Sequence, residues 1–193
     1  TAVKVIQLEG RQICLPSFID CHTHILYAGQ RANDFAMRNA GSSYLEIAAT
    51  GGGIWSTVKH TRACTEDDLV ALVLERSFTL LRQGITTIEV KSGYGLSIDE
   101  ELKGLRAIKR ANQKSKVDLV STCLAAHMLP KDYVGSAEDY LDEMATTLFP
   151  ILKEEALTNR IDAFIEESAF TAAQIRPYFQ KAKAAGFAIT VHA

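Results

Sequence analysis

The stretch SFIDCHTHI, residues 17–25, places two histidines two positions apart in an otherwise strand-like sequence. Because successive side chains of a strand point to opposite faces, His22 and His24 are predicted to share one face with Asp20. Two neutral imidazoles on one face suit a divalent ion such as Zn²⁺ or Fe²⁺. An isolated pair of this kind is more often a hydrogen-bonded pair without metal, so the rest of the chain has to decide between the two interpretations.

Strand and helix patterns alternate from this stretch to residue 193. Runs rich in apolar and β-branched residues predict further strands over residues 85–95, 117–127, 160–170 and 187–193. Apolar residues at helical spacing predict helices over residues 65–84, 97–113, 136–157 and 171–186. Thr65 and the acidic residues after it are expected to cap the first of these helices. The alternation predicts an α/β fold with a parallel sheet and right-handed crossovers.

Two segments fall outside this alternation. Residues 3–10 alternate weakly and are predicted to be a short strand, part of a remnant of a small β domain over residues 1–14. Residues 27–65 are polar and are expected to form an elaborated loop, with short helices near residues 42–50 and 54–63.

Polar residues at the strand ends favour a (β/α)8 barrel over an open doubly wound sheet. They lie at or near the predicted carboxyl ends of different strands, as on the active face of a barrel: His22, His24, residues 89–94, His127, Glu166, Glu167 and His192. No glycine-rich phosphate turn follows the first strand, as a dinucleotide-binding open sheet would require. A complete barrel takes about 250 residues, so residues 15–193 are expected to form an incomplete one with its first five strands.

His192 strengthens the metal interpretation. It ends the last predicted strand, AITVHA, and is expected to reach the same edge of the sheet as His22 and His24. Three imidazoles from two strands form a set of metal ligands, whereas a single histidine at a strand end is more often structural.

The composition limits which kinds of molecule the protein is expected to bind. The formal charge of −2 gives no basic surface for nucleic acid or an anionic membrane. No apolar run reaches the length of a transmembrane helix, and four unclustered cysteines fit reduced thiols, so a cytoplasmic location is expected. A small-molecule substrate remains the expected partner.

The segment LPSFIDCHTH resembles the metal-binding first strand of the amidohydrolase superfamily. From Leu15 onward, the segments AGQRANDFAMRNAGSSYLEIAATGGGI, TVKHTRA, GITTIEVKSGYGL, AAHMLP and VHA resemble the imidazolonepropionase family within it. The resemblance implies a hydrolase of histidine degradation that contains one Zn or Fe ion and opens 4-imidazolone-5-propanoate to N-formimino-L-glutamate. It also implies a homodimer when the protein is complete.

The resemblance carries roles to particular residues. His22, His24 and His192 match the family's histidine ligands of the metal. The residues that match its substrate contacts are Arg31, Tyr94 and His127. The family's acid/base groups and an aspartate ligand correspond to positions beyond Ala193, so no catalytic acid or base is expected within residues 1–193, and the chain alone is expected to be inactive.

Two alternatives stay open. Another cyclic amidohydrolase or a deaminase of the same superfamily would keep the histidines and the barrel but would not need Arg31 or KSGYGL. A half barrel without catalytic activity is the other alternative, and its exposed strand edges would make it prone to associate.

Overall fold

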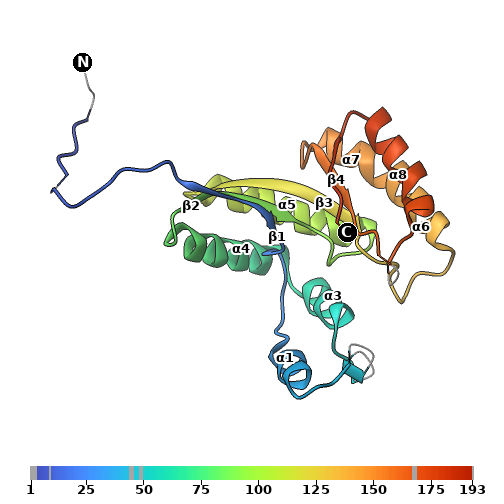
Figure 1. Ribbon diagram of the computed structural model, residues 1–193. Helices are drawn as coiled ribbons and strands as arrows, with labels where there is room; N and C mark the ends of the chain where they lie inside the picture. Colours follow the sequence, from blue (N-terminus) through green and yellow to red (C-terminus); the bar gives the residue numbers. More distant parts are fainter. Residues whose placement is uncertain (1–3, 9, 44–45, 48–49, 167–168, 193) are drawn as a thin grey trace.

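A parallel five-stranded sheet forms the centre of the molecule (Figure 1). The computed structural model describes residues 4–8, 10–43, 46–47, 50–166 and 169–192. The strands are β1 (Phe18–Thr23), β2 (Ile85–Lys91), β3 (Asp118–Ala126), β4 (Arg160–Ala163) and β5 (Ala188–Ile189). The predicted α/β fold with a parallel sheet is therefore confirmed.

The strands lie side by side in the order in which they occur along the chain, β1-β2-β3-β4-β5. A doubly wound sheet reverses its strand order at one point, where it binds its ligand. This sheet has no such reversal among the described strands, and its order is compatible with part of a barrel.

Helices between the strands bury the apolar side of the sheet. Helices α4 (Glu66–Leu81) and α5 (Ile98–Lys114) pack against each other and against β2 and β3, while α8 (Ala172–Ala184) packs against β4 and β5. Ile88 and Val90 of β2 and Leu105 of α5 are fully buried in the resulting core. Removal of these apolar side chains from water is the main term that stabilises the fold.

Helix α4 begins and ends where its sequence predicts. The Thr65 side chain accepts a hydrogen bond from the Asp68 backbone amide, and the Asp68 carboxylate accepts one in return from the Thr65 amide. Gly84 follows the helix with a φ of 89°, a conformation that residues with a Cβ rarely adopt. The chain then enters β2 directly.

The helix predicted over residues 136–157 is interrupted. It consists of α6 (Ala137–Glu143), a π-helical turn η1 (Met144–Leu148) and α7 (Phe149–Glu154). Pro150 lies at the start of α7 and has no amide hydrogen to donate to the preceding turn. A change to wider helical spacing just before a proline accommodates the missing hydrogen bond.

The amino-terminal half differs most from the prediction. Residues 4–8 form no strand, although one was expected over residues 3–10, because no described segment pairs with them. The expected polar loop contains a helix that was not predicted, α1 (Ala32–Asn39), and the predicted α3 (Ile54–Ala63). Of the short helix expected near residues 42–50, Glu46 and Ile47 are helical, and residues 44–45 and 48–49 lie outside the described residues.

The pairing of β1 with β2 is irregular at the carboxyl end of β1. Asp20 pairs with Ile88 and Thr23 with Val90, so three residue steps on β1 match two on β2. A register shift of this kind, a β-bulge or a related irregularity, changes the direction of nearby side chains.

No helix of the described residues is long and apolar enough to cross a membrane.

Candidate metal centre

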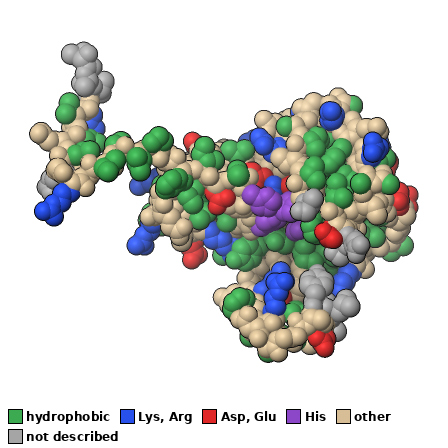
Figure 2. Space-filling view, in the orientation of Figure 1, with side chains coloured by type: hydrophobic (Ala, Val, Ile, Leu, Met, Phe, Trp, Pro, Cys, Tyr) green, Lys and Arg blue, Asp and Glu red, His purple; other side chains and the backbone are tan. Residues whose placement is uncertain are grey.

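Three histidine rings converge at the carboxyl edge of the sheet. The Nε2 atom of His192 lies 3.0 Å from Nε2 of His22 and 3.0 Å from Nε2 of His24. One ring nitrogen from each of the three histidines lies within 4.8 Å of the others. Figure 2 shows histidine side chains grouped on the visible surface of the molecule. The structure thus brings together the three histidines that the sequence predicted as metal ligands.

Local backbone structure brings the rings together. His22 lies within the register shift between Asp20 and Thr23 of β1, and His24 lies just past the end of that strand. The backbone of His192 continues the pairing of β5 with β4, because its amide donates to Ala163 O at 2.9 Å and its carbonyl accepts from Ile165 N at 2.9 Å. The two outer strands of the described sheet, β1 and β5, thus present side chains from distant parts of the sequence at one edge.

A row of buried charges lies behind His192. Asp162 Oδ2 lies 3.0 Å from His192 Nδ1 and 2.7 Å from Lys91 Nζ. Lys91 Nζ also lies 2.7 Å from Glu89 Oε1. These side chains of β2 and β4 are at most 8% exposed, so each charge depends on its partners rather than on water.

The row fixes the tautomer of His192. An ionised carboxylate can only accept, so the Nδ1–H of His192 donates to Asp162 and leaves the lone pair of Nε2 directed at the other histidines. Burial opposes ionisation of Asp162, but the Lys91 ammonium and His192 together hold its pKa below the usual value. Asp162 therefore stays charged at neutral pH and keeps His192 oriented.

The other two imidazoles are held neutral. Burial, with the neighbouring His127 and His192, lowers the pKa of His24 to about 3. Partial burial and the proximity of His192 also lower the pKa of His22. Metal ions bind the neutral form of imidazole, so at pH 7 both rings are already in the protonation state that metal binding requires.

The donor set fits a divalent metal ion. Two nitrogens that bind zinc tetrahedrally lie roughly 3.3 Å apart, given Zn–N distances of about 2.0–2.1 Å, which is close to the 3.0 Å separations seen here. The tautomer of His192 directs its Nε2 lone pair at the cluster, and a cation would bind all three Nε2 atoms when His22 and His24 adopt the same tautomer. His22 is exposed, which leaves one side of the cluster open to a water molecule or a substrate.

His127 and Tyr94 border this cluster, as their strand-end positions predicted. The ring of His127 stacks on His24 with centroids 5.6 Å apart, and the ring of Tyr94 lies 5.4 Å from His127 and 6.1 Å from His24. His127 Nδ1 lies 2.8 Å from the carbonyl oxygen of Gly93, an acceptor, so Nδ1 carries the proton and Nε2 is an acceptor. Burial lowers the pKa of His127 to about 4, which keeps this ring neutral.

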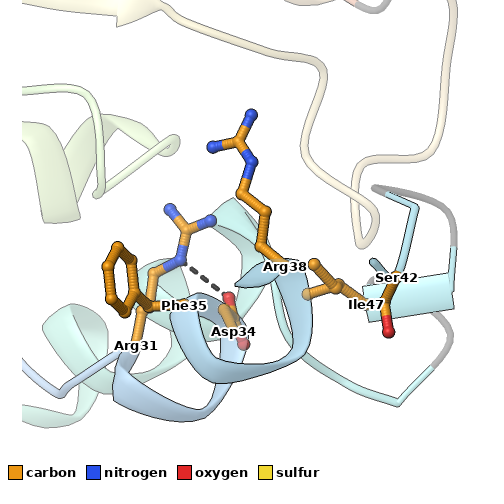
Figure 3. Close-up of a pocket in the computed structure, with 6 residues that line it drawn as sticks. All are labelled: Arg31, Asp34, Phe35, Arg38, Ser42 and Ile47. Carbon is orange, nitrogen blue, oxygen red and sulfur yellow. Dashed lines mark hydrogen bonds and ion pairs between the residues drawn. The ribbon is translucent and has the colours of Figure 1, made fainter. Parts of the chain in front are cut away.

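Arg31 lies in a different neighbourhood, at the start of α1. Its Nε donates to Asp34 Oδ2 at 2.8 Å, and it borders a pocket of about 390 Å³ that contains none of the converging histidines. Figure 3 shows the guanidinium groups of Arg31 and Arg38 extending to the same side of α1. Burial raises the pKa of Tyr94, and the charge of Arg31 opposes that rise, so Arg31 lies within electrostatic reach of Tyr94.

Of the remaining polar residues predicted at strand ends, Glu166 is exposed and Glu167 lies outside the described residues.

Sequence reasoning missed the partners of His192. Asp162 and Lys91 stand in the short segments RIDAF and IEVK, where a charged residue interrupts a buried strand. A charge at such a position needs a partner, and this was the available signal. It does not identify the partner, because Lys91 and Asp162 are separated by a strand and two helical segments in the sequence.

Comparisons with known proteins agree with the sequence resemblance. The chain is 47% identical over its full length to the imidazolonepropionase of Pseudomonas entomophila, covering 48% of that protein. It is 48% identical over 98% of its length to the imidazolonepropionase of Mesorhizobium japonicum, covering 46% of that protein. No family model matches the chain. The chain thus spans about half the length of the curated relatives it matches.

Proposed function

We propose that this chain is the metal-binding part of an imidazolonepropionase, a hydrolase of histidine degradation that opens 4-imidazolone-5-propanoate to N-formimino-L-glutamate. The observation that carries the proposal is the meeting of His22, His24 and His192 at 3.0 Å spacings in a chain 44–48% identical to imidazolonepropionases. The proposal combines two observations. The histidine cluster supplies a site for a metal ion, and the sequence identity over about half the length of the relatives supplies the reaction.

In this proposal His22, His24 and His192 hold one divalent ion, Zn or Fe. The chemistry supplied by such an ion is polarisation of the ring carbonyl and a lowered pKa of a water molecule. The contribution of the protein described here is to orient the metal-binding atoms. Asp162 keeps the Nε2 lone pair of His192 directed at the site, and Lys91 keeps Asp162 charged.

The substrate is proposed to lie over the open side of the cluster. His127 Nε2 is free to accept a hydrogen bond from a ring N–H, because Nδ1 already donates to Gly93. Tyr94 keeps its proton, since burial raises its pKa, and can donate to a substrate oxygen. Arg31 offers a planar pair of donors that matches the propanoate carboxylate.

The larger architecture is also proposed. Residues 15–193 would contribute the first five strands of a (β/α)8 barrel, and residues 1–14 would belong to a small β domain. The consecutive order of the five parallel strands supports the barrel. A homodimeric, cytoplasmic enzyme is the corresponding expectation for the complete protein.

Metal content is the first test. Elemental analysis after dialysis against metal-free buffer should give about one equivalent of Zn or Fe per chain. His22→Ala should lose it, because two imidazoles remain, whereas His60→Ala should keep it, because His60 instead bonds to the carbonyl of Ser56. Equal metal content in the wild type and His22→Ala would contradict the assignment of ligands.

Substrate identity needs the complete polypeptide that carries this sequence. Turnover of 4-imidazolone-5-propanoate should exceed turnover of other cyclic amides and of amidine substrates of deaminases. Arg31→Met should raise KM for the propanoate substrate, because the substrate carboxylate loses its ionic partner. A preference for an uncharged cyclic amide would instead favour a different amidohydrolase.

A further inference from the structure

The loop that carries Tyr94 has an unusual backbone path. Residues 92–97 join β2 to α5, and within them Gly93 has a φ of 101° and Leu96 a φ of 56°. A positive φ is unfavourable for leucine, so the surrounding structure has to hold this conformation. The loop is also pressed against the start of α5, since a Cβ on Gly95 would lie 2.6 Å from the backbone of Glu100 and Glu101.

Glu101 binds the amides of this loop. Its carboxylate, on the first turn of α5, accepts hydrogen bonds from the amides of Gly93 (3.2 Å), Gly95 (2.9 Å) and Leu96 (2.8 Å). The residue is 1% exposed. Irregular backbone cannot satisfy these amides itself, and one buried carboxylate supplies acceptors for all three.

Arg62 binds the carbonyls of the same loop. From α3, its Nε donates to Gly95 O at 2.6 Å and its Nη2 to Leu96 O at 3.3 Å. Asp132 accepts from Nη1 at 2.5 Å and so holds the guanidinium from its other side. The backbone on both sides of Leu96 is therefore bound by a carboxylate through its amides and by a guanidinium through its carbonyls.

The clamped loop delivers two groups to the histidine cluster. It projects Tyr94, whose ring lies 5.4 Å from that of His127. It also presents the Gly93 carbonyl that fixes the tautomer of His127. A shift of the loop would move the Tyr94 hydroxyl and the His127 acceptor together.

We propose that Glu101 and Arg62 are positioning residues that set substrate affinity by clamping residues 92–97, so that Tyr94 and His127 face the ligand together. The inference rests on the proposed function for what the ligand is. The clamp itself is a property of the backbone and is tested without any substrate. Neither residue is expected to touch the substrate, since their hydrogen-bonding groups are directed at the loop.

Amide hydrogen exchange tests the clamp directly. Glu101→Gln removes the negative charge of the acceptor that all three amides share and places an N–H₂ donor where Gly93 N contacts Oε2, so exchange at Gly93, Gly95 and Leu96 should accelerate about tenfold or more. Asp99→Asn, an exposed change on the same helix turn, should leave these amides unchanged. Unchanged exchange at all three amides in Glu101→Gln would overturn the proposal.

Kinetics of the complete protein test the consequence. Glu101→Gln should raise KM about tenfold and change kcat less than about threefold, because ground-state contacts are lost. In a Tyr94→Phe background the same substitution should raise KM less than about threefold, because the contact that it displaces is already absent. Fully multiplicative effects of the two substitutions would show that Glu101 does not act through Tyr94.

Arg62→Met keeps the test available if Glu101→Gln does not fold. It retains the aliphatic part of the side chain and should raise KM in the same direction, with Lys59→Met on the exposed side of α3 as the control. An unchanged KM in Arg62→Met would overturn the role of Arg62. If the wild-type protein does not turn over the substrate while the exchange result holds, the proposed function fails and the clamp remains.

Discussion

Asp162 is the residue through which the sheet orients the histidine cluster. Its carboxylate contacts both His192 Nδ1 and Lys91 Nζ. Asp162→Asn should weaken metal binding about 10–100-fold, since the amide removes the charge that makes His192 a stronger ligand. Competition with a chromophoric chelator measures this, and Asp142→Asn, an exposed aspartate on α6, is the matched control. Equal affinities would mean that His192 is not oriented through Asp162.

Lys91 is predicted to matter for stability as well. Lys91→Met leaves the carboxylates of Glu89 and Asp162 facing each other in a buried site without a cation. Loss of one partner from a buried charge group costs about 3–5 kcal/mol, measured as the free energy of unfolding in urea. Lys181→Met removes an exposed partner of Asp142 and should cost less than about 1 kcal/mol. A similar loss in both variants would contradict the stabilising role of the buried row.

For single residues, the sequence predicted the three histidines of the cluster but not the buried charged residues that orient His192. His22 and His24 are marked by their spacing, and His192 by its place at a strand end. Asp162 and Lys91 act through a contact between β2 and β4, two strands that are not adjacent in the sheet. Such a contact depends on how the sheet curves, and one-dimensional spacing carries no information on that curvature.

Among the elements, α4 owes part of its stability to the capping box of Thr65. Thr65→Ala should lower the free energy of unfolding by about 1 kcal/mol. The substitution removes the hydroxyl that accepts from the Asp68 amide and donates to the Asp68 carboxylate. Thermal or urea unfolding measures the change. Thr79→Ala, on the same helix with its hydroxyl bonded to Glu75 O, should have an effect within about 0.5 kcal/mol. An equal or larger loss at Thr79 would show that removal of a threonine hydroxyl, rather than loss of the cap, lowers the stability.

Elements with long, regular patterns were predicted well. The bounds of α4, α5 and α8 lie within three residues of the prediction, since capping residues and apolar periodicity act locally. The π-helical turn before Pro150 and helix α1 were not predicted. Helix α1 has only eight residues and buries none of them, so it is shorter than the window over which a periodic apolar pattern identifies a helix.

For the whole molecule, buried neutral histidines make stability depend on pH. Burial lowers the pKa of His127 to about 4 and that of His24 to about 3, from a value of 6.5. Between pH 6.5 and 4 the unfolded chain takes up protons that the folded chain does not, so stability should fall as the pH falls. Urea unfolding in a metal chelator measures the slope.

His127→Gln should flatten that pH dependence, because it removes one of the histidines whose pKa the folded state lowers. His60→Gln, a change at an exposed histidine, is the matched control variant. A slope that is equally steep in the wild type and His127→Gln would mean that other groups dominate the titration.

The parallel sheet and its strand order follow from alternating patterns in the sequence, because crossover connections of this length have one preferred hand. The absence of a strand over residues 4–8 could not be predicted in the same way. A strand exists only with a partner, and the apolar side chains of Val5, Ile6 and Leu8 remain exposed instead.

The contact between His22 and His192 joins residues 170 positions apart. The entropic cost of closing a loop grows with the logarithm of its length, so this is among the most expensive contacts for an unfolded chain to make. A cation bound by these rings would link β1 to β5, and it would stabilise the folded state much as a cross-link over a very long loop does. The three histidines meet only once β5 has paired with β4, so binding of the proposed metal ion would report the completion of folding.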